Sequence, residues 1–138
     1  MIEIKFIYKE QVEQMWPHVS PWLQEATYVY PGYTVSDIKV ALLEGRHHLW
    51  LVFSDGELTA AFTTAIHIYP SAKVVEAVHL GGTGVESWIE QVADAVAEFG
   101  KINECSSVIM TGRPGFEKVY KKCGFVKAAV FLRRDINV

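Results

Sequence analysis

Cysteine is scarce in this chain of 138 residues, and its scarcity excludes two classes of small protein. Cys105 and Cys123 are the only two cysteines. Two are too few for a disulfide framework or a cysteine-rich metal motif. Both are therefore expected to be buried or half-buried thiols in a reducing cytoplasm. The five prolines and ten glycines form no repeat, linker or low-complexity tract, so a single domain over residues 1–138 is expected.

Long hydrophobic runs and an excess of positive charge are also lacking. The longest apolar runs, at 49–53 and 60–68, fall well short of the roughly 18 residues that a membrane span requires. Residues 1–5 show neither the basic region nor the apolar core of a signal peptide. Thirteen basic and sixteen acidic residues give a net charge of −3. This balance argues against nucleic acid or a membrane as a partner.

The chain is rich in alternating and helix-periodic apolar patterns, and these predict its elements. Strands are expected at 2–8, 48–54, 58–69, 73–80, 107–111 and 125–134. Helices are expected at 11–25, 36–43, 84–99 and 114–123, the second of them capped by Thr34 or Ser36. Pro17 and Pro21 lie inside the first helix and predict a kink or two shorter pieces.

The order of these elements indicates an α/β fold. Asp55-Gly56 is a strong signal for a hairpin, which requires an antiparallel part of the sheet. The two late strand–helix–strand units indicate some parallel pairing. We therefore expect a mixed, mostly antiparallel sheet of six to seven strands with helices on both faces.

The segment Val119-Tyr120-x-x-x-Gly124-Phe125 near the C-terminus carries the main resemblance. It is similar to a motif of the Gcn5-related N-acetyltransferases, whose order of elements also matches this chain over essentially its whole length. The resemblance implies a single-domain acetyltransferase fold that uses acetyl-CoA to acetylate an amine. It also implies that Tyr120 lies beside the thioether, where its hydroxyl can protonate the departing thiolate.

A glycine-rich loop, His79-Leu-Gly-Gly-Thr-Gly84, stands between an expected strand and an expected helix. Glycines let backbone N–H groups converge, and a helix N-terminus favours an anion. The family places a [Gln/Arg]-x-x-Gly-x-[Gly/Ala] signature here for the pyrophosphate of coenzyme A, and His79 departs from its first position. The alternative is a plain strand-to-helix turn, with Glu86 complementing the helix dipole. The resemblance implies coenzyme A contacts from Val78, Leu80, Gly81, Gly82, Thr83, Gly84, Val85 and, at the last strand-to-helix junction, Arg113.

A base is also needed, because an amine must lose a proton to attack. Glu76 lies in the strand before the glycine loop, from which this family often draws its base, and His79 and His67 are alternatives. Backbone N–H groups near Val78 or Leu80 would stabilise negative charge on the thioester oxygen. His47-His48 has no further ligand at metal spacing, so no metal is expected.

A narrower pattern runs along the chain: Trp16-Pro, Pro21-Trp22-Leu, Asp37-Ile, Leu49-Trp50, Tyr69-Pro, Gly81-Gly with Trp88, and Gly112-Arg113-x-Gly115-Phe116. It resembles small acetyltransferase-like proteins of tailed bacteriophages, whose substrate the resemblance does not identify. In such a protein the fold could be kept while the chemistry is lost, leaving a phage or host-directed binding protein. The acceptor of an active enzyme would be a small-molecule or peptide amine, and exposed edge strands would allow a homodimer.

Overall fold

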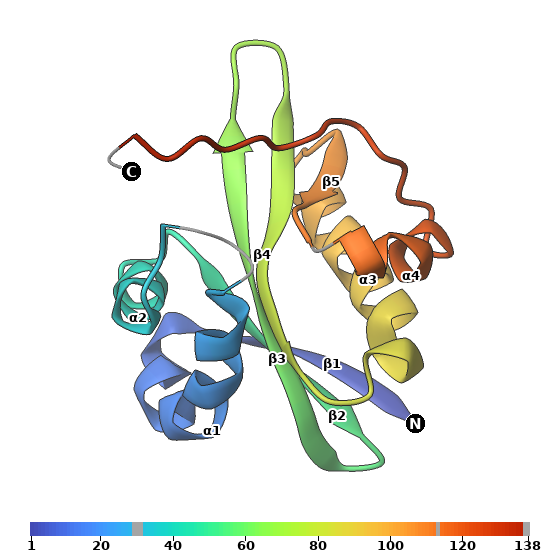
Figure 1. The fold of residues 1–138 in the computed structure, drawn as a ribbon. Helices are drawn as coiled ribbons and strands as arrows, with labels where there is room; N and C mark the ends of the chain where they lie inside the picture. The colour runs from blue at the N-terminus through green and yellow to red at the C-terminus, as the bar shows by residue number, and fades with distance from the viewer. Residues whose placement is uncertain (29–31, 113, 137–138) are drawn as a thin grey trace.

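A computed structural model describes residues 1–28, 32–112 and 114–136. Five strands and four α-helices make up the described fold, with short 3-10 turns η1 (Lys9–Gln11) and η2 (Pro114–Phe116) (Figure 1). The strands are β1 (Ile2–Ile7), β2 (His48–Ser54), β3 (Glu57–Ile68), β4 (Lys73–Gly82) and β5 (Ser107–Met110). The helices are α1 (Val12–Ala26), α2 (Val35–Leu43), α3 (Val85–Ile102) and α4 (Glu117–Lys121).

The strands form one sheet in the order β1-β2-β3-β4-β5. The first four pair antiparallel and β5 pairs parallel to β4, as a mixed, mostly antiparallel sheet requires. The prediction of six to seven strands is wrong, because this sheet has five. Residues 125–134, expected to be a strand, run extended in the described structure without joining the sheet. A β-type sequence becomes a strand only when a neighbour accepts its hydrogen bonds.

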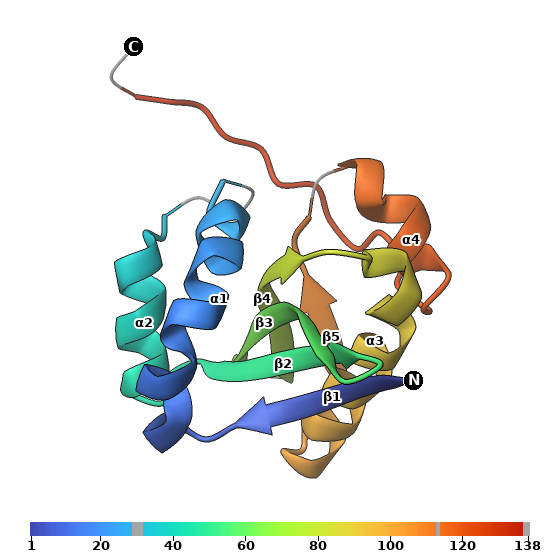
Figure 2. The same ribbon diagram turned by 90° about the horizontal axis from the view of Figure 1, so that it is seen from below.

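Helices α1 and α2 cover one face of the sheet, and α3 and α4 lie on the other (Figure 2). Under α1 and α2, buried residues such as Val19, Leu23 and Ile38 pack on Leu49 and Leu51 of β2. Under α3, the 3.6-residue stripe predicted from the sequence packs on the opposite face of the sheet. That stripe consists of Val85, Trp88, Ile89, Val92, Val96 and Phe99, of which Val85 and Phe99 are only partly buried. Helices on both faces are therefore confirmed.

The two prolines of α1 do not divide it. Pro17 and Pro21 both lie inside one helix, so the two-piece alternative is wrong. They are four residues apart and both exposed, so they lie on the solvent-facing side of the helix. The carbonyl groups that lose an N–H donor to these prolines lie on the same side. Water can satisfy those carbonyls, while the opposite side of the helix stays in the core.

Local signals in the sequence set other boundaries as expected. Thr34 caps α2, since its hydroxyl oxygen accepts from the Asp37 N–H while an Asp37 carboxylate oxygen accepts from the Thr34 N–H. Asp55 and Gly56 both have positive φ and join β2 to β3. Helix α3 extends three residues past the expected stop, because Gly100 stays helical where it packs closely on Val75. Among the described residues no helix is both long and apolar enough to cross a bilayer.

Candidate functional site

The site is built where two parallel strands part. Pairing between β4 and β5 runs from Val74 with Ser107 to Ala77 with Met110. Strand β4 then continues to Gly82, while β5 ends at Met110. A pocket of about 150 Å³ lies at this split. It is lined by Ala26, Ala77, Val78, Leu80, Gly81, Gly82, Val85, Trp88, Met110, Thr111, Gly112, Phe116 and Tyr120.

A bulge in β4 marks the start of the split. Phe62 of β3 pairs with Leu80 and Thr64 pairs with Ala77, so Thr63 alone faces both Val78 and His79. The Thr63 hydroxyl oxygen accepts a hydrogen bond from the His79 backbone N–H at 3.2 Å. The Thr63 hydroxyl thus accepts the hydrogen bond of a backbone N–H that the bulge leaves without a partner in the β3–β4 ladder. This bulge turns the backbone of β4 at the point where its β5 neighbour ends.

Tyr120 lines the pocket together with Gly81 and Gly82 of the glycine loop. It comes from α4, and its ring contacts those of Phe116 and Phe125 at centroid distances of 6.2 and 6.0 Å. Burial raises the pKa of the Tyr120 hydroxyl above its ordinary value, with a smaller contribution from Cys123. The side chain is therefore a neutral hydrogen-bond donor at physiological pH.

Two glycines of the loop are required by packing. A Cβ atom on Gly81 would come within 2.3 Å of the Trp22 carbonyl oxygen in α1. One on Gly82 would come within 2.5 Å of the Ala60 Cα atom in β3, and Gly82 also has a φ of +137°. These residues let α1 and β3 approach the end of β4, and both line the pocket. Close approach of protein backbone thus explains two glycines that the sequence suggested only for an anion.

The rest of the loop leads into α3. Gly84 is the N-cap of α3 with a φ of +72°, a left-handed conformation that favours glycine. The Trp88 indole N–H donates to the Thr83 carbonyl oxygen at 2.8 Å and so fixes the turn from inside the helix. Thr83, Gly84 and Glu86 are exposed, and Glu86 lies in the first turn of α3. The predicted contacts Thr83 and Gly84 lie at the pocket's border and not in its lining.

Glu76 is a buried carboxylate with a histidine partner. Only 4% of its surface is exposed, and its Oε1 atom lies 2.7 Å from His67 Nε2. Strand alternation places both side chains on the α1–α2 face, the face to which Ala61 of β3 contributes. Glu76 does not line the pocket, but its chain neighbour Ala77 does. His67 is partly exposed, so this pair connects the interior beside the split with solvent.

His79 also lies on the α1–α2 face of the sheet, but it is fully buried. Its ring is 4.9 Å from that of Tyr33, and its Nδ1 atom lies 3.4 Å from the Thr63 hydroxyl oxygen. Burial, with a smaller effect of His47, lowers the pKa of His79 to about 4. The imidazole is therefore neutral at physiological pH, and its surroundings resemble those of a core histidine. Arg113, the predicted phosphate contact, lies outside the described residues.

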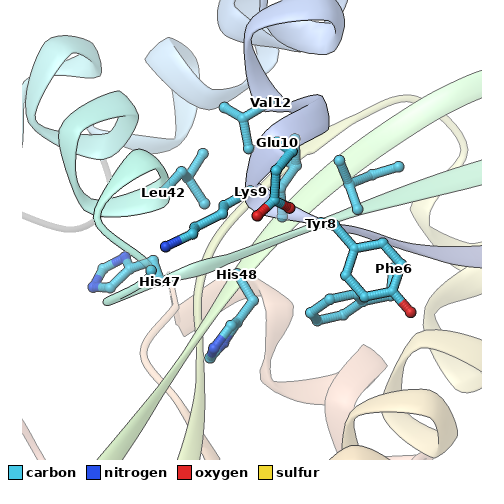
Figure 3. A pocket seen from close by; sticks show the side chains of 11 residues that line it. Phe6, Tyr8, Lys9, Glu10, Val12, Leu42, His47 and His48 are labelled. Atoms are coloured by element: carbon cyan, nitrogen blue, oxygen red, sulfur yellow. The ribbon is translucent and has the colours of Figure 1, made fainter.

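A second pocket, of about 220 Å³, lies between the end of β1, the end of α2 and the start of β2. Figure 3 shows the Lys9 side chain extending across it towards the loop that carries His47. His47 is buried, and burial lowers its pKa to about 4. None of the predicted site residues lines this pocket. Within residues 1–28, 32–112 and 114–136, no group of three or more His, Cys, Asp or Glu side chains could hold a metal ion.

The sequence reasoning missed several residues of the site. Thr63 carries no motif, because its role depends on a bulge in the strand beside it. Met110 lines the pocket although nothing in its spacing indicates this, and Phe116, quoted above only as the end of Gly112-Arg113-x-Gly115-Phe116, lines it too. Gly112 could have been found, since it directly follows the expected strand 107–111 and a Cβ there would meet the Tyr120 ring at 3.6 Å.

Comparisons with solved structures identify the fold. A glucosamine-6-phosphate N-acetyltransferase from Arabidopsis thaliana matches with a TM-score of 0.68 and 12% identity, over 99% of each chain. The aminoglycoside N-acetyltransferase AAC(6')-Iy in complex with CoA matches with a TM-score of 0.70 and 16% identity, over 100% of this chain and 96% of the other. A "predicted acetyltransferase with acetyl-CoA" from Clostridium acetobutylicum matches with a TM-score of 0.69 and 11% identity, over 98% and 96%. No protein-family model and no curated protein matches the sequence.

The chain therefore has the α/β fold of the Gcn5-related acetyltransferases, with a single open sheet of five strands. At these identities the likeness establishes the fold alone.

Proposed function

We propose that the protein transfers an acetyl group from acetyl-CoA to an amine by direct attack. The observation that carries this proposal is the pocket at the β4–β5 split, which brings Tyr120 and the end of β4 together. Further support comes from the similar structures, which include acetyltransferases bound to acetyl-CoA and to CoA. Fold alone does not fix function, so the site must carry the argument.

The residues at the split suit acetyl-CoA. When bound, acetyl-CoA supplies an acetyl thioester, whose carbonyl carbon an amine can attack. Val78 and Leu80 lie where β4 has left its β5 neighbour, and their backbone groups would bind the pantetheine arm and the thioester oxygen. Gly81, Gly82, Thr83, Gly84 and Val85 lead into the N-terminus of α3, which would face the pyrophosphate. Arg113 is proposed as a further phosphate contact.

Glu76 is the proposed base. Its carboxylate is buried on the α1–α2 face of β4, one residue before Ala77 of the pocket lining, and would take the proton from the amine directly or through water. His67, 2.7 Å away and partly exposed, would pass that proton to solvent. His79 is the weaker candidate, because its imidazole is enclosed beside the Tyr33 ring and the Thr63 hydroxyl, whereas Glu76 is paired with the partly exposed His67.

Tyr120 is the proposed acid. A phenol is protonated at neutral pH, and burial, which raises the pKa of Tyr120, keeps this hydroxyl so. A thiolate is a good leaving group, so a hydrogen bond or a proton from a phenol is sufficient assistance. Tyr120 and the β4 residues Val78 and Leu80 line the same pocket, so they can take separate roles at the breaking bond.

The acceptor is proposed to be a small-molecule or peptide amine. Similar structures include an aminoglycoside acetyltransferase in complex with sisomicin and a ribosomal-protein-alanine N-acetyltransferase from Brucella melitensis. Tyr33, next to His79 on the α1–α2 face, would border the acceptor's approach.

A second candidate is a binding protein that has kept the fold and lost the chemistry. The observation in its favour is the exposed Glu86 in the first turn of α3, together with the lack of any lysine or arginine from His79 to Trp88. A carboxylate there competes with a phosphate for the same N–H groups.

A thermal-shift titration separates the two candidates. If the folded protein binds acetyl-CoA, its melting temperature rises with ligand concentration, and at one hundred times Kd the stabilisation is about 2.7 kcal/mol. ATP at equal concentrations controls for non-specific phosphate binding. No rise at millimolar acetyl-CoA would refute acetyl transfer and favour the binding protein.

A further inference from the structure

The second pocket, between the end of β1, the end of α2 and the start of β2, has no part in the proposed acetyl transfer. It measures about 220 Å³ and shares no lining residue with the pocket at the β4–β5 split. Pockets for drug-sized ligands are larger, at roughly 300–1,000 Å³. The ligand that fits the second pocket is therefore a small metabolite rather than a nucleotide or a coenzyme.

The interior of this pocket is apolar. Four buried residues from four different elements line it, each at most 4% exposed: Ile7, Val12, Leu42 and Leu49. They belong to β1, α1, α2 and β2. Apolar walls of this kind favour an aliphatic group on the ligand, because its apolar surface is removed from water there.

Two exposed charges of opposite sign also line the pocket. They are those of Lys9 and Glu10, at the turn between β1 and α1. In the part of the chain that the structure describes, neither forms an ion pair, not even with the other. Figure 3 shows their charged ends apart from one another. A zwitterion would give each charge a partner, whereas a simple anion would be repelled by Glu10 and a simple cation by Lys9.

A buried polar atom belongs to the same pocket. His47 lines it and is 6% exposed, and among the described residues its Nδ1 atom has no hydrogen-bond partner. Such an atom costs free energy until a ligand or a water molecule bonds to it. Figure 3 shows the Lys9 side chain extending towards the loop that carries His47. In the tautomer with its proton on Nδ1, the imidazole and the Lys9 ammonium group can therefore converge on one carboxylate.

We propose that this pocket binds a small aliphatic amino acid. Lys9 and His47 bind its carboxylate, and Glu10 binds its ammonium group. Its aliphatic side chain lies against Leu42 and Leu49. This amino acid is a ligand separate from the acetyl acceptor, since its amine is held by Glu10 and the two pockets have no residue in common. The inference does not depend on acetyl transfer.

Titration of the unmodified chain with L-leucine and L-valine, followed by nuclear magnetic resonance, tests the proposal. The backbone amide signals of residues 8–10 and 45–49 and the imidazole signals of His47 should shift saturably. The imidazole of His18, exposed on α1, should not shift. A ligand of this size should bind with a Kd on the order of 1 mM. No saturable shift up to about 20 mM would overturn the proposal. So would shifts centred on Tyr120 and Gly81, which would place the amino acid in the pocket at the β4–β5 split.

Analogues of leucine test whether both charges are required. Isocaproate lacks the amine of leucine, and isoamylamine lacks its carboxylate. Each should bind at least roughly tenfold more weakly than L-leucine, because each loses one charge-assisted contact. An analogue that binds as tightly as L-leucine would refute recognition of a zwitterion.

Two variants then locate the contacts. Lys9→Gln and Glu10→Gln should each weaken L-leucine binding roughly tenfold. Lys101→Gln, exposed in the last turn of α3, is the matched control and should leave binding unchanged. Folded Lys9→Gln and Glu10→Gln variants that bind L-leucine as tightly as the unmodified chain would refute the site. If a variant fails to fold, the titrations of the unmodified chain with L-leucine and its analogues still decide.

Discussion

The contact between Gly81 and Trp22 gives the sharpest test of how the site is assembled. In Gly81→Ala the added Cβ atom would lie 2.3 Å from the Trp22 carbonyl oxygen, 2.8 Å from its carbonyl carbon and 3.0 Å from its Cβ atom. None of these atoms belongs to the flexible end of a side chain. The substitution can be accommodated only if α1 moves away from β4.

The size of the effect follows from the kind of clash. Overpacking a well-filled interior costs typically about 1–3 kcal/mol, and a clash with backbone belongs at the upper end of that range. No positive φ is involved at Gly81, so backbone strain does not add to this figure. For a domain of this size, 1 kcal/mol corresponds to a decrease in melting temperature of roughly 3–5 °C. Gly81→Ala should therefore melt on the order of 10 °C lower.

Chemical and thermal denaturation, compared with a matched variant, measure this. Gly115→Ala is the control, because a Cβ atom there meets nothing within 4 Å and no positive φ is involved. It should change the free energy of unfolding by only a few tenths of a kcal/mol. If Gly81→Ala is as stable as Gly115→Ala, then α1 does not abut the end of β4 and the packing explanation of this glycine is wrong.

Four further predictions concern the proposed chemistry and the local structure. Tyr120→Phe should lower turnover about 10²-fold and leave the acetyl-CoA thermal shift intact; unchanged turnover would remove this hydroxyl from the mechanism. Glu76→Gln should also lower turnover about 10²-fold at neutral pH with the thermal shift retained, and the loss should diminish at high pH, where free amine is abundant. The pKa of His79 is about 4 in the folded protein and 6.5 ordinarily, so the unfolded chain binds the proton first as the pH falls. Its contribution to stability is therefore full above about pH 6.5 and is lost towards pH 4; the melting temperature should fall over this window, and less steeply in His79→Gln. Thr34→Ala should lower the free energy of unfolding by about 1 kcal/mol, because it removes the N-cap of α2. Ser36→Ala, two residues further along in the first turn, should lower it much less in the same denaturation assay.

The local elements of this fold could be predicted from short-range physics. The stripe of α3, the Asp55-Gly56 hairpin and the Thr34 cap each depend on residues a few positions apart, and all three are confirmed. Pro17 and Pro21 mark where local rules fail. Their effect on α1 depends on which side of the helix faces water, and only the packed structure decides that.

The number of strands in the sheet could not be predicted from short segments of the sequence. Residues 125–134 have the composition of a strand, but a strand exists only beside a partner, and the monomer provides none for them. The five strands that do pair were each predicted, because alternation and turn residues define them within the chain.

The sequence by itself named about half of the residues that line the pocket and left their arrangement open. Six of the predicted residues line the pocket at the β4–β5 split: Val78, Leu80, Gly81, Gly82, Val85 and Tyr120. Only the tertiary structure shows that β5 ends at Met110 while β4 continues to Gly82. It also shows that the Thr63 hydroxyl bonds to the bulge, and that neighbouring backbone leaves no room for a Cβ atom at Gly81 or Gly82. The physical reason is that motifs record what a residue can do, whereas pairing register and close packing depend on residues distant in the chain.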